Sequence, residues 1–149
     1  MSDPMSDQAE RFQLIARWFE QLTSESLNEI ESLYASRTRF VDLFNDLQGV
    51  GLVRQVFEHM FKTLDQPRFV VTRMASTGPI GFMTWTFSFT CRGRGQIIEG
   101  CTQFELDADG LIMLHQDYWD AAAQVYEQIP LLGSVLRVLR RKLSLPETH

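Results

Sequence analysis

The hydrophobic periodicity of this chain changes at Phe69, and this change constrains the fold more than any other feature. Before it, apolar residues recur every three or four positions, as in helices that bury one face. After it, apolar and polar residues alternate in four stretches: 68–76, 81–91, 96–107 and 111–119. Such alternation predicts half-buried strands, and the connecting segments carry the Gly, Pro and Asp that hairpin turns favour. We therefore expect an α+β fold, with helices on one side of a curved antiparallel sheet.

Three helices are expected before the sheet. The first follows from apolar residues at helical spacing: Phe12, Ile15, Phe19 and Leu22. Residues 26–29 have the spacing of a capping box, which predicts a second helix ending near Tyr34. After an extended piece at 38–43, the apolar stripe from Val53 to Leu64 predicts the third helix, which closes before Pro67.

Length and composition favour one domain. The chain has 149 residues, of which 44% are hydrophobic, enough for a core with a cavity. Residues 1–8 are polar and predict a flexible start to a domain spanning 9–120. They do not resemble a signal peptide, and the sequence holds no long apolar span, so the expected location is the cytoplasm. The net charge of -5, with no zinc spacing and no phosphate-binding loop, argues against nucleic acid as a partner.

The two cysteines are expected to remain reduced. Cys91 lies near a predicted hairpin turn, whereas Cys101 lies well away from it on the neighbouring strand. Hairpin register should hold the two residues several pairs apart. Free structural thiols agree with a cytoplasmic location.

The last predicted strand carries the residues that point most directly to function. Alternation places Met113, His115, Asp117 and Trp119 on one face. Two titratable groups between large apolar ones are costly to bury, so this face is expected to line a mostly hydrophobic pocket. The alternative is that His115 and Asp117 face solvent while their neighbours face the core.

The two preceding strands suggest where a ligand would fit. In the stretch 81–91, one face is apolar and the other hydroxylic; the apolar face carries Met83, Trp85, Phe87 and Phe89. On the next strand Gly100 and Thr102 are small where the neighbouring strands carry Trp85 and His115. Small groups opposite large ones leave room for a ligand, although packing alone also explains the pattern.

Several short matches resemble the NTF2-like superfamily, most closely its SnoaL-like polyketide cyclase and ketosteroid isomerase-related branches. They are residues 14–18, Val41-Asp42 followed by Gly49, residues 107–110, and Tyr118-Trp119. The resemblance implies a cone-shaped curved antiparallel sheet with three N-terminal helices over its concave face. The same fold serves isomerases, cyclases, hydrolases and binding proteins, so it does not fix the activity.

The resemblance also implies roles for individual residues. The general base of the isomerases falls on Asp42, while Trp18 and Thr102 stand where those enzymes carry their two donors. His115 and Asp117 are similar to the histidine and carboxylate of the cyclases. The Asp-Arg-Asp arrangement of the limonene epoxide hydrolase branch is poorly supported, because Arg92 and Arg94 fall in a predicted turn and Arg17 on a predicted helix beside Trp18.

These residues predict general acid/base chemistry without a metal or other cofactor. The expected catalytic residues are Asp42, His115 and Asp117, one carboxylate abstracting a proton and the imidazole relaying it. The expected substrate-binding residues are Trp18, Phe57, Met83, Trp85, Phe87, Gly100, Thr102 and Trp119. The predicted function is a cofactor-free isomerase, cyclase or dehydratase acting on a steroid-, polyketide- or lipid-like compound. The alternative is a non-catalytic module that binds such a ligand or a partner protein.

The C-terminal segment 121–149 is expected to form a basic amphipathic helical extension. Its apolar stripe is accompanied by four positive charges, at Arg137, Arg140, Arg141 and Lys142. We expect it to fold back over the domain or a dimer mate and cover the pocket mouth, with its charges in water. The second interpretation places this helix on an anionic membrane surface. A homodimer is expected through the outer, Thr/Ser/Gln-bearing face of the sheet.

Overall fold

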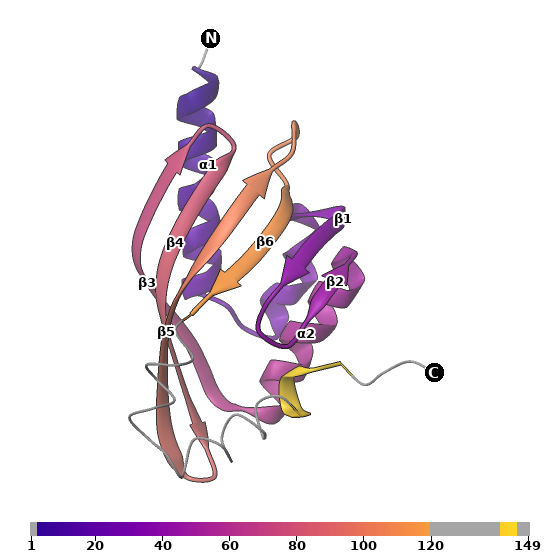
Figure 1. Cartoon of the computed structure of the whole chain (residues 1–149), viewed down its shortest axis with the longest axis vertical. Helices are drawn as coiled ribbons and strands as arrows, with labels where there is room; N and C mark the ends of the chain where they lie inside the picture. Colours follow the sequence, from indigo (N-terminus) through magenta and orange to yellow (C-terminus); the bar gives the residue numbers. More distant parts are fainter. Residues whose placement is uncertain (1–2, 120–140, 146–149) are drawn as a thin grey trace.

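The computed structural model describes residues 3–119 and 141–145 and contains a six-stranded sheet in the order β2-β1-β6-β5-β4-β3 (Figure 1). The helices of the described part are α1 (Pro4–Glu20), the 3-10 helix η1 (Glu25–Ser32) and α2 (Val50–Thr63). The strands are β1 (Tyr34–Val41), β2 (Asp46–Gln48), β3 (Asp65–Thr77), β4 (Ile80–Cys91), β5 (Arg94–Leu106) and β6 (Ile112–Tyr118). The predicted α+β class is confirmed.

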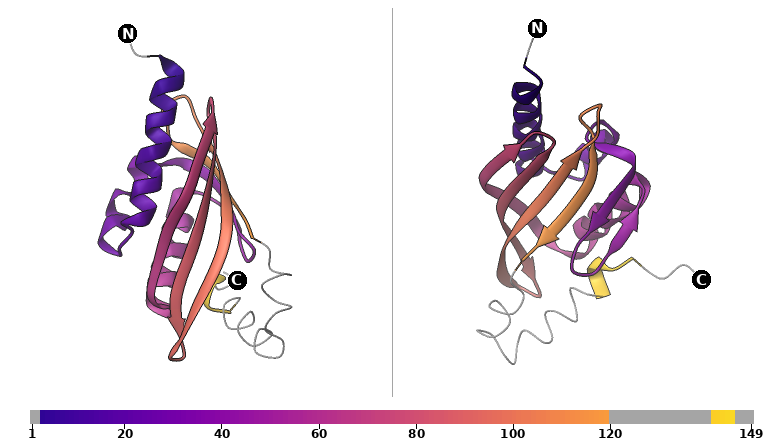
Figure 2. Two further views of the ribbon diagram at one scale, coloured as in Figure 1. Left: turned by 90° about the vertical axis from the view of Figure 1, so that its left-hand side faces the viewer. Right: turned by 45° about the horizontal axis from the view of Figure 1, so that its top comes forward.

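Helix α1 forms where its apolar spacing predicts it. Asp3 caps it by accepting a hydrogen bond from the backbone N–H of Met5, and Pro4 occupies a first-turn position where its missing N–H costs nothing. The helix begins at Pro4, so residues 4–8 of the expected flexible start at 1–8 are helical in the structure. Its buried face packs on β3, and Figure 2 shows α1 crossing one face of the sheet.

The second predicted helix is a 3-10 helix, not an α-helix. The capping-box spacing starting at Ser26 is misleading, because the reciprocal hydrogen bonds at this end join Ser26 to Thr23. The third predicted helix is confirmed as α2. It begins after Gly49, whose φ of 111° is a backbone conformation that favours glycine.

Each of the four predicted strands is present, but the sheet is not antiparallel throughout. Strands β3, β4, β5 and β6 form antiparallel pairs, whereas β1 pairs in parallel with β6. Alternation reveals that a segment is a strand and which face is buried, but not the direction of its partner. The short β2, which pairs with the end of β1, was also not predicted.

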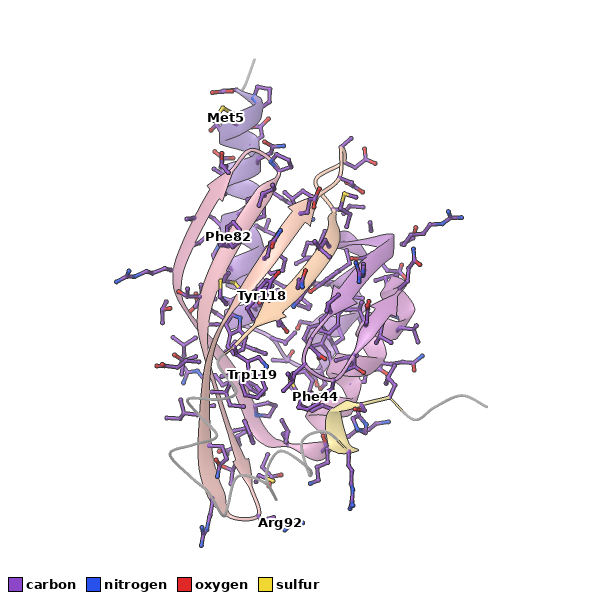
Figure 3. All side chains as sticks on the ribbon, in the orientation of Figure 1. Met5, Phe44, Phe82, Arg92, Tyr118 and Trp119 are labelled. Carbon is purple, nitrogen blue, oxygen red and sulfur yellow. The ribbon has the colours of Figure 1, made fainter. Side chains whose placement is uncertain are left out.

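The inner face of the sheet packs against the helices. The alternation predicted for β4 is confirmed, since its four apolar residues are buried: Met83, Trp85, Phe87 and Phe89. The next strand buries Thr102, Phe104 and Leu106 on the same face. Large side chains of the opposite face, among them Phe82 and Tyr118, point away from the helices (Figure 3).

A β-bulge in β6 reverses the predicted orientation of one residue, Met113. Glu105 of β5 is opposite Leu114, yet the next residue, Leu106, is opposite Ile112, so Met113 is an extra residue in β6. The bulge turns Met113 outward, where it is 45% exposed, and places Ile112 in the core. The prediction that Met113 shares the pocket face is therefore wrong, whereas His115 is buried at 3% exposure.

The register keeps the two cysteines apart. Cys91 is opposite Arg94, while Cys101 is opposite Thr84, and both thiols are free. The expected register, which holds the two residues several pairs apart, is confirmed.

Only a short piece of the predicted C-terminal extension is described. Within residues 141–145, Leu143 and Leu145 pack against the hydrophobic core, and Lys142 donates a hydrogen bond to the carbonyl of Thr63. This end therefore folds back onto the domain. The rest of the expected extension, with Arg137 and Arg140, lies outside the described residues. Among the described helices, none is long and apolar enough to cross a membrane.

Candidate functional site

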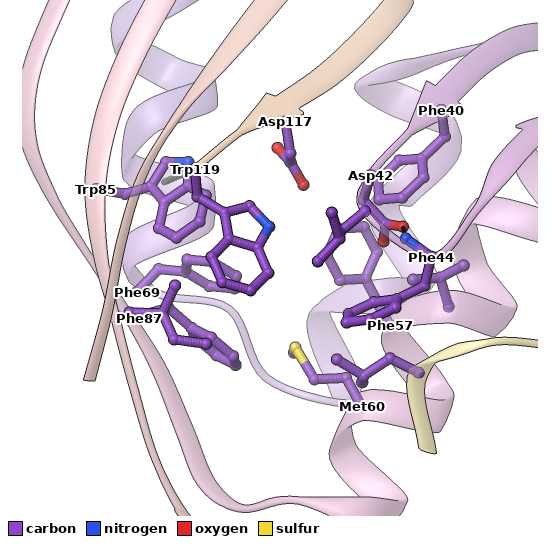
Figure 4. A pocket seen from close by; sticks show the side chains of 14 residues that line it. Phe40, Asp42, Phe44, Phe57, Met60, Phe69, Trp85, Phe87, Asp117 and Trp119 are labelled. Carbon is purple, nitrogen blue, oxygen red and sulfur yellow. Dashed lines mark hydrogen bonds between the residues drawn. The ribbon is translucent and has the colours of Figure 1, made fainter. Parts of the chain in front are cut away.

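An apolar cavity of about 90 Å³ lies between the inner face of the sheet and α2 (Figure 4). Its described lining is Phe40, Asp42, Leu43, Phe44, Val56, Phe57, Met60, Phe69, Trp85, Phe87, Ile98, Asp117, Trp119 and Leu143. Two carboxylates, Asp42 and Asp117, are the ionisable groups of this described lining. The cavity adjoins an open depression of about 640 Å³, which shares both carboxylates and Trp119.

Register brings Asp117 to the cavity together with the groups that hold it. On the inner face Thr102 of β5 is opposite Asp117 of β6, and two residues earlier in β6 lies His115. The Asp117 Oδ1 atom lies 2.8 Å from the His115 Nε2 atom and accepts a hydrogen bond of 2.5 Å from the Thr102 hydroxyl. The carboxylate thus lies near the end of β6, where two neighbouring side chains hold one of its oxygens.

A phenol and an indole extend this arrangement in opposite directions. The Tyr34 hydroxyl lies 2.8 Å from the His115 Nδ1 atom. Complete burial raises the pKa of Tyr34 well above its usual value, and the charge of Asp117 raises it further, so this phenol stays protonated and donates. His115 can then donate from Nε2 to Asp117. On the other side, Trp85 donates its indole N–H to Thr102 at 2.8 Å.

Asp42 follows β1 at the edge of the cavity. Its Oδ1 atom accepts hydrogen bonds from the backbone N–H groups of Phe44 and Asn45, at 2.8 and 2.6 Å. Burial raises the pKa of Asp42 above its usual value, the Phe44 hydrogen bond opposes this, and the charge of Asp117 raises it again. The site therefore joins two carboxylates with different surroundings: Asp42 is pushed toward its neutral form, and Asp117 accepts two donors.

Six of the predicted site residues line the cavity: Asp42, Phe57, Trp85, Phe87, Asp117 and Trp119. His115 does not line it; the imidazole lies behind Asp117, with its ring centroid 4.4 Å from that of Phe40. Thr102 and Met83 are buried beside the lining without forming part of it. Trp18 packs on Phe57, and its buried indole N–H finds no hydrogen-bond partner in the described structure.

Gly100 does not leave the predicted space for a ligand. A Cβ atom at this position would lie 2.5 Å from two ring carbons of Trp85, so the indole itself fills that space. Gly100 lines the open depression instead. The small residue is explained by the close approach of a ring.

Sequence reasoning missed several residues of the site. Tyr34 was expected at the end of a helix, and Phe40, Phe69 and Leu143 were not expected in the lining. For Phe40 a signal existed, because Thr38, Phe40 and Asp42 alternate along the extended segment. Across residues 3–119 and 141–145, no three His, Cys, Asp or Glu side chains converge as a metal site would require. Nor does any arginine in these ranges form an ion pair with Asp42 or Asp117.

A family model described as SnoaL-like domain matches residues 15–115. Among curated proteins no match was found. An LEH-like epoxide hydrolase from M. tuberculosis superposes with a TM-score of 0.68 at 15% identity, covering 99% of this chain and 100% of that one. A SnoaL-like polyketide cyclase, so described, from Jannaschia sp. CCS1 gives 0.69 at 14% identity, with coverages of 99% and 98%. TerC, co-crystallized with polyporic acid, gives 0.65 at 16% identity, with coverages of 82% and 95%. At these identities the likeness is one of fold.

Proposed function

Because this chain belongs to the SnoaL-like domain family, we propose that it is a cofactor-free acid/base enzyme that moves a proton on a hydrophobic small molecule. The observation that carries the proposal is the pair Asp42 and Asp117 in one apolar cavity. Burial raises the pKa of Asp42, and the nearby charge of Asp117 raises it further. Paired carboxylates whose surroundings differ are the usual basis for assigning one acid and one base.

In this proposal Asp117 is the general base and Asp42 the general acid. Asp117 Oδ1 lies within hydrogen-bond distance of the Thr102 hydroxyl and of the His115 Nε2 atom, and these two contacts hold the carboxylate in place. Its other oxygen, Oδ2, accepts no hydrogen bond from the described residues and is available to take a proton from a substrate. Asp42, held toward its neutral form by burial, returns a proton to the developing oxyanion or alkoxide.

His115 serves as a positioning residue rather than as a second acid. Its Nε2 atom points to Asp117 and its Nδ1 atom to Tyr34, and it does not reach the cavity lining. This differs from the role expected from sequence, in which the imidazole itself relays the proton to the substrate. Tyr34 fixes the tautomer by donating to Nδ1.

The proposed substrate is a compound with a compact apolar portion that enters the cavity. Aromatic rings form much of the wall, among them Phe57, Trp85 and Trp119. A cavity of about 90 Å³ holds only a small ring or branch, so the rest of a larger molecule would lie in the open depression. Steroid-, polyketide- and lipid-like compounds all have such portions.

Small probes of each reaction type test the proposal. The full-length protein is incubated in D2O with phenylacetone, 3-cyclohexenone or cyclohexene oxide. Deuterium uptake at the α-carbon, double-bond migration and ring opening are followed by NMR. We expect turnover of at least one probe, and a loss of about 10²-fold or more in Asp117→Asn and Asp42→Asn. The matched control is Asp109→Asn, which changes an exposed carboxylate in the turn before β6.

A binding module without catalysis is the second candidate, favoured by the small cavity volume. Ligand pockets commonly measure roughly 300–1,000 Å³, well above the 90 Å³ found here. Quenching of tryptophan fluorescence by the same probes, without turnover and without dependence on Asp117, would favour this candidate.

A further inference from the structure

Trp85 makes two different contacts with the site. Its ring lines the cavity, while its indole N–H donates to the Thr102 hydroxyl on the neighbouring strand. Thr102 in turn donates to Asp117, so a side chain of the cavity wall is connected to the carboxylate through one hydroxyl. The indole is 7% exposed, which shields this connection from water.

The donor and the acceptor of each hydrogen bond between Trp85, Thr102 and Asp117 can be assigned. An indole N–H only donates, so Thr102 Oγ1 must accept from Trp85. The single hydroxyl hydrogen of Thr102 is then free to point at Asp117 Oδ1, an acceptor 2.5 Å away. Without the indole donor, the same hydroxyl could rotate and offer its hydrogen elsewhere.

Gly100 leaves room for the Trp85 indole because it has no side chain. Trp85 of β4 is directly opposite Gly100 of β5, and Thr102 follows two residues later on the same face. A Cβ atom on Gly100 would lie 2.5 Å from the Cη2 and Cζ2 atoms of Trp85 and 3.0 Å from the Tyr118 carbonyl. A rigid ring and a backbone carbonyl leave no room for a methyl group.

We propose that Trp85, seated on Gly100, is a positioning residue that aims Asp117 into the cavity through Thr102. The functional part of this inference rests on the proposed role of Asp117 as base; the positional part does not. A substrate that packs against the Trp85 ring then affects the position of Asp117 through the Trp85–Thr102 and Thr102–Asp117 hydrogen bonds. The groups that also act on Asp117 are His115 and Tyr34 on one side, Asp42 across the cavity, and Cys101 on β5.

The positional part is tested without any substrate. The chain has three tryptophans, so an NMR spectrum of indole N–H groups contains three signals, and Trp85→Phe assigns one of them. In Thr102→Val that signal should move and lose its protection from solvent exchange, whereas Thr102→Ser should keep both. The matched control is Thr84→Val, which removes a hydroxyl bonded to Thr72 on β3.

Crystal structures of the variants complete this part. In Thr102→Val the Asp117 carboxylate should rotate away from β5, and in Trp85→Phe it should adopt more than one orientation. An Asp117 side chain that keeps its wild-type position in both variants would overturn the proposal. An unchanged Trp85 signal in Thr102→Val would also overturn it.

The functional part uses deuterium exchange into phenylacetone. Trp85→Phe keeps a ring in the wall but removes the donor, so kcat should fall about tenfold while KM stays within about twofold. Thr102→Val should show the same fall, and Thr102→Ser should recover most of it. If Trp85→Phe raises KM and leaves kcat unchanged, Trp85 only lines the cavity and the proposal is wrong.

Gly100→Ala approaches the same connection from the other strand. It should displace the Trp85 indole signal and lower kcat as Trp85→Phe does. Gly95→Ala, on the same strand with open space around its Cα, is the control and should change neither. If Asp117→Asn turns over phenylacetone at the wild-type rate, the proposed function fails, and the spectra and crystal structures still decide the positional part.

Discussion

The side chain of Asn45 donates a hydrogen bond to the backbone carbonyl of Leu143, with an N···O distance of 3.0 Å. The same Nδ2 atom lies 3.2 and 3.3 Å from the two carboxylate oxygens of Asp42. Leu143 also lines the cavity. One buried amide therefore connects the returning C-terminal segment to the proposed general acid.

Replacement of Asn45 by alanine should loosen this segment. The change leaves the Leu143 carbonyl without its donor, and the expected cost is about 1–3 kcal/mol of unfolding free energy in urea titrations. Trypsin should cleave faster after Lys142, whose own hydrogen bond to Thr63 depends on the same docking. Asn28→Ala, at an exposed position of η1, is the control. Equal cleavage rates in both variants would contradict the prediction.

Asp42→Asn should change how stability depends on pH. Because burial raises the pKa of Asp42 in the folded state, the wild type is most stable, relative to the variant, below the unfolded pKa of about 4. As pH rises through the raised folded pKa, that relative stability is lost. The amide keeps the acceptor for Phe44 and Asn45. Urea titrations at several pH values should show the variant gaining on the wild type toward neutrality; a constant difference would refute this.

Tyr34 should not ionise in the folded protein at moderately alkaline pH. Its folded pKa is raised well above the usual value, so its contribution to stability is present below about pH 10 and is lost as pH rises further. Tyrosinate absorbance should therefore show one phase that coincides with alkaline unfolding and is missing in Tyr34→Phe. Tyr118→Phe, at a half-exposed position on the outer face, is the control and should leave that phase in place.

The outer face of the sheet should form a homodimer. It exposes apolar side chains on neighbouring strands: Val70, Phe82, Ile97 and Tyr118. An exposed apolar patch of this kind marks a contact surface. Analytical ultracentrifugation should find a dimer that Phe82→Glu dissociates. Leu14→Glu, at an exposed position of α1, should leave it intact; a monomeric wild type would end this interpretation.

Patterns of local periodicity were enough to predict much of the sheet. Alternation placed Trp85, Asp117 and Trp119 toward one pocket, and all three line the cavity. Periodicity fails where one residue is inserted into a ladder: the bulge at Met113 shifts the outward position by one residue. It also says nothing about how a gap is filled, so the sequence left both a ligand and ordinary packing open at Gly100, and the structure places an indole there.

Contacts between distant segments lay beyond prediction. Tyr34 and His115 are 81 positions apart, and no local sequence pattern predicts a hydrogen bond between them. The capping-box spacing predicted a helix ending near Tyr34, but the segment forms a 3-10 helix and Tyr34 begins β1. A motif of four residues does not distinguish an α-helix from a 3-10 helix.

The parallel pairing of β1 with β6 determines when this protein becomes complete during synthesis. In the described sheet β1 is hydrogen-bonded to β2 and to β6, and β6 is the last of the six strands to leave the ribosome. Until then β1 and β5 both present open edges, which are templates for association with other chains. Asp42 directly follows β1 and Asp117 lies in β6, so the two carboxylates meet only when β6 joins the sheet. A nascent chain that stops short of β6 therefore exposes two strand edges and lacks Asp117, because closing the sheet and assembling the carboxylate pair are the same folding event.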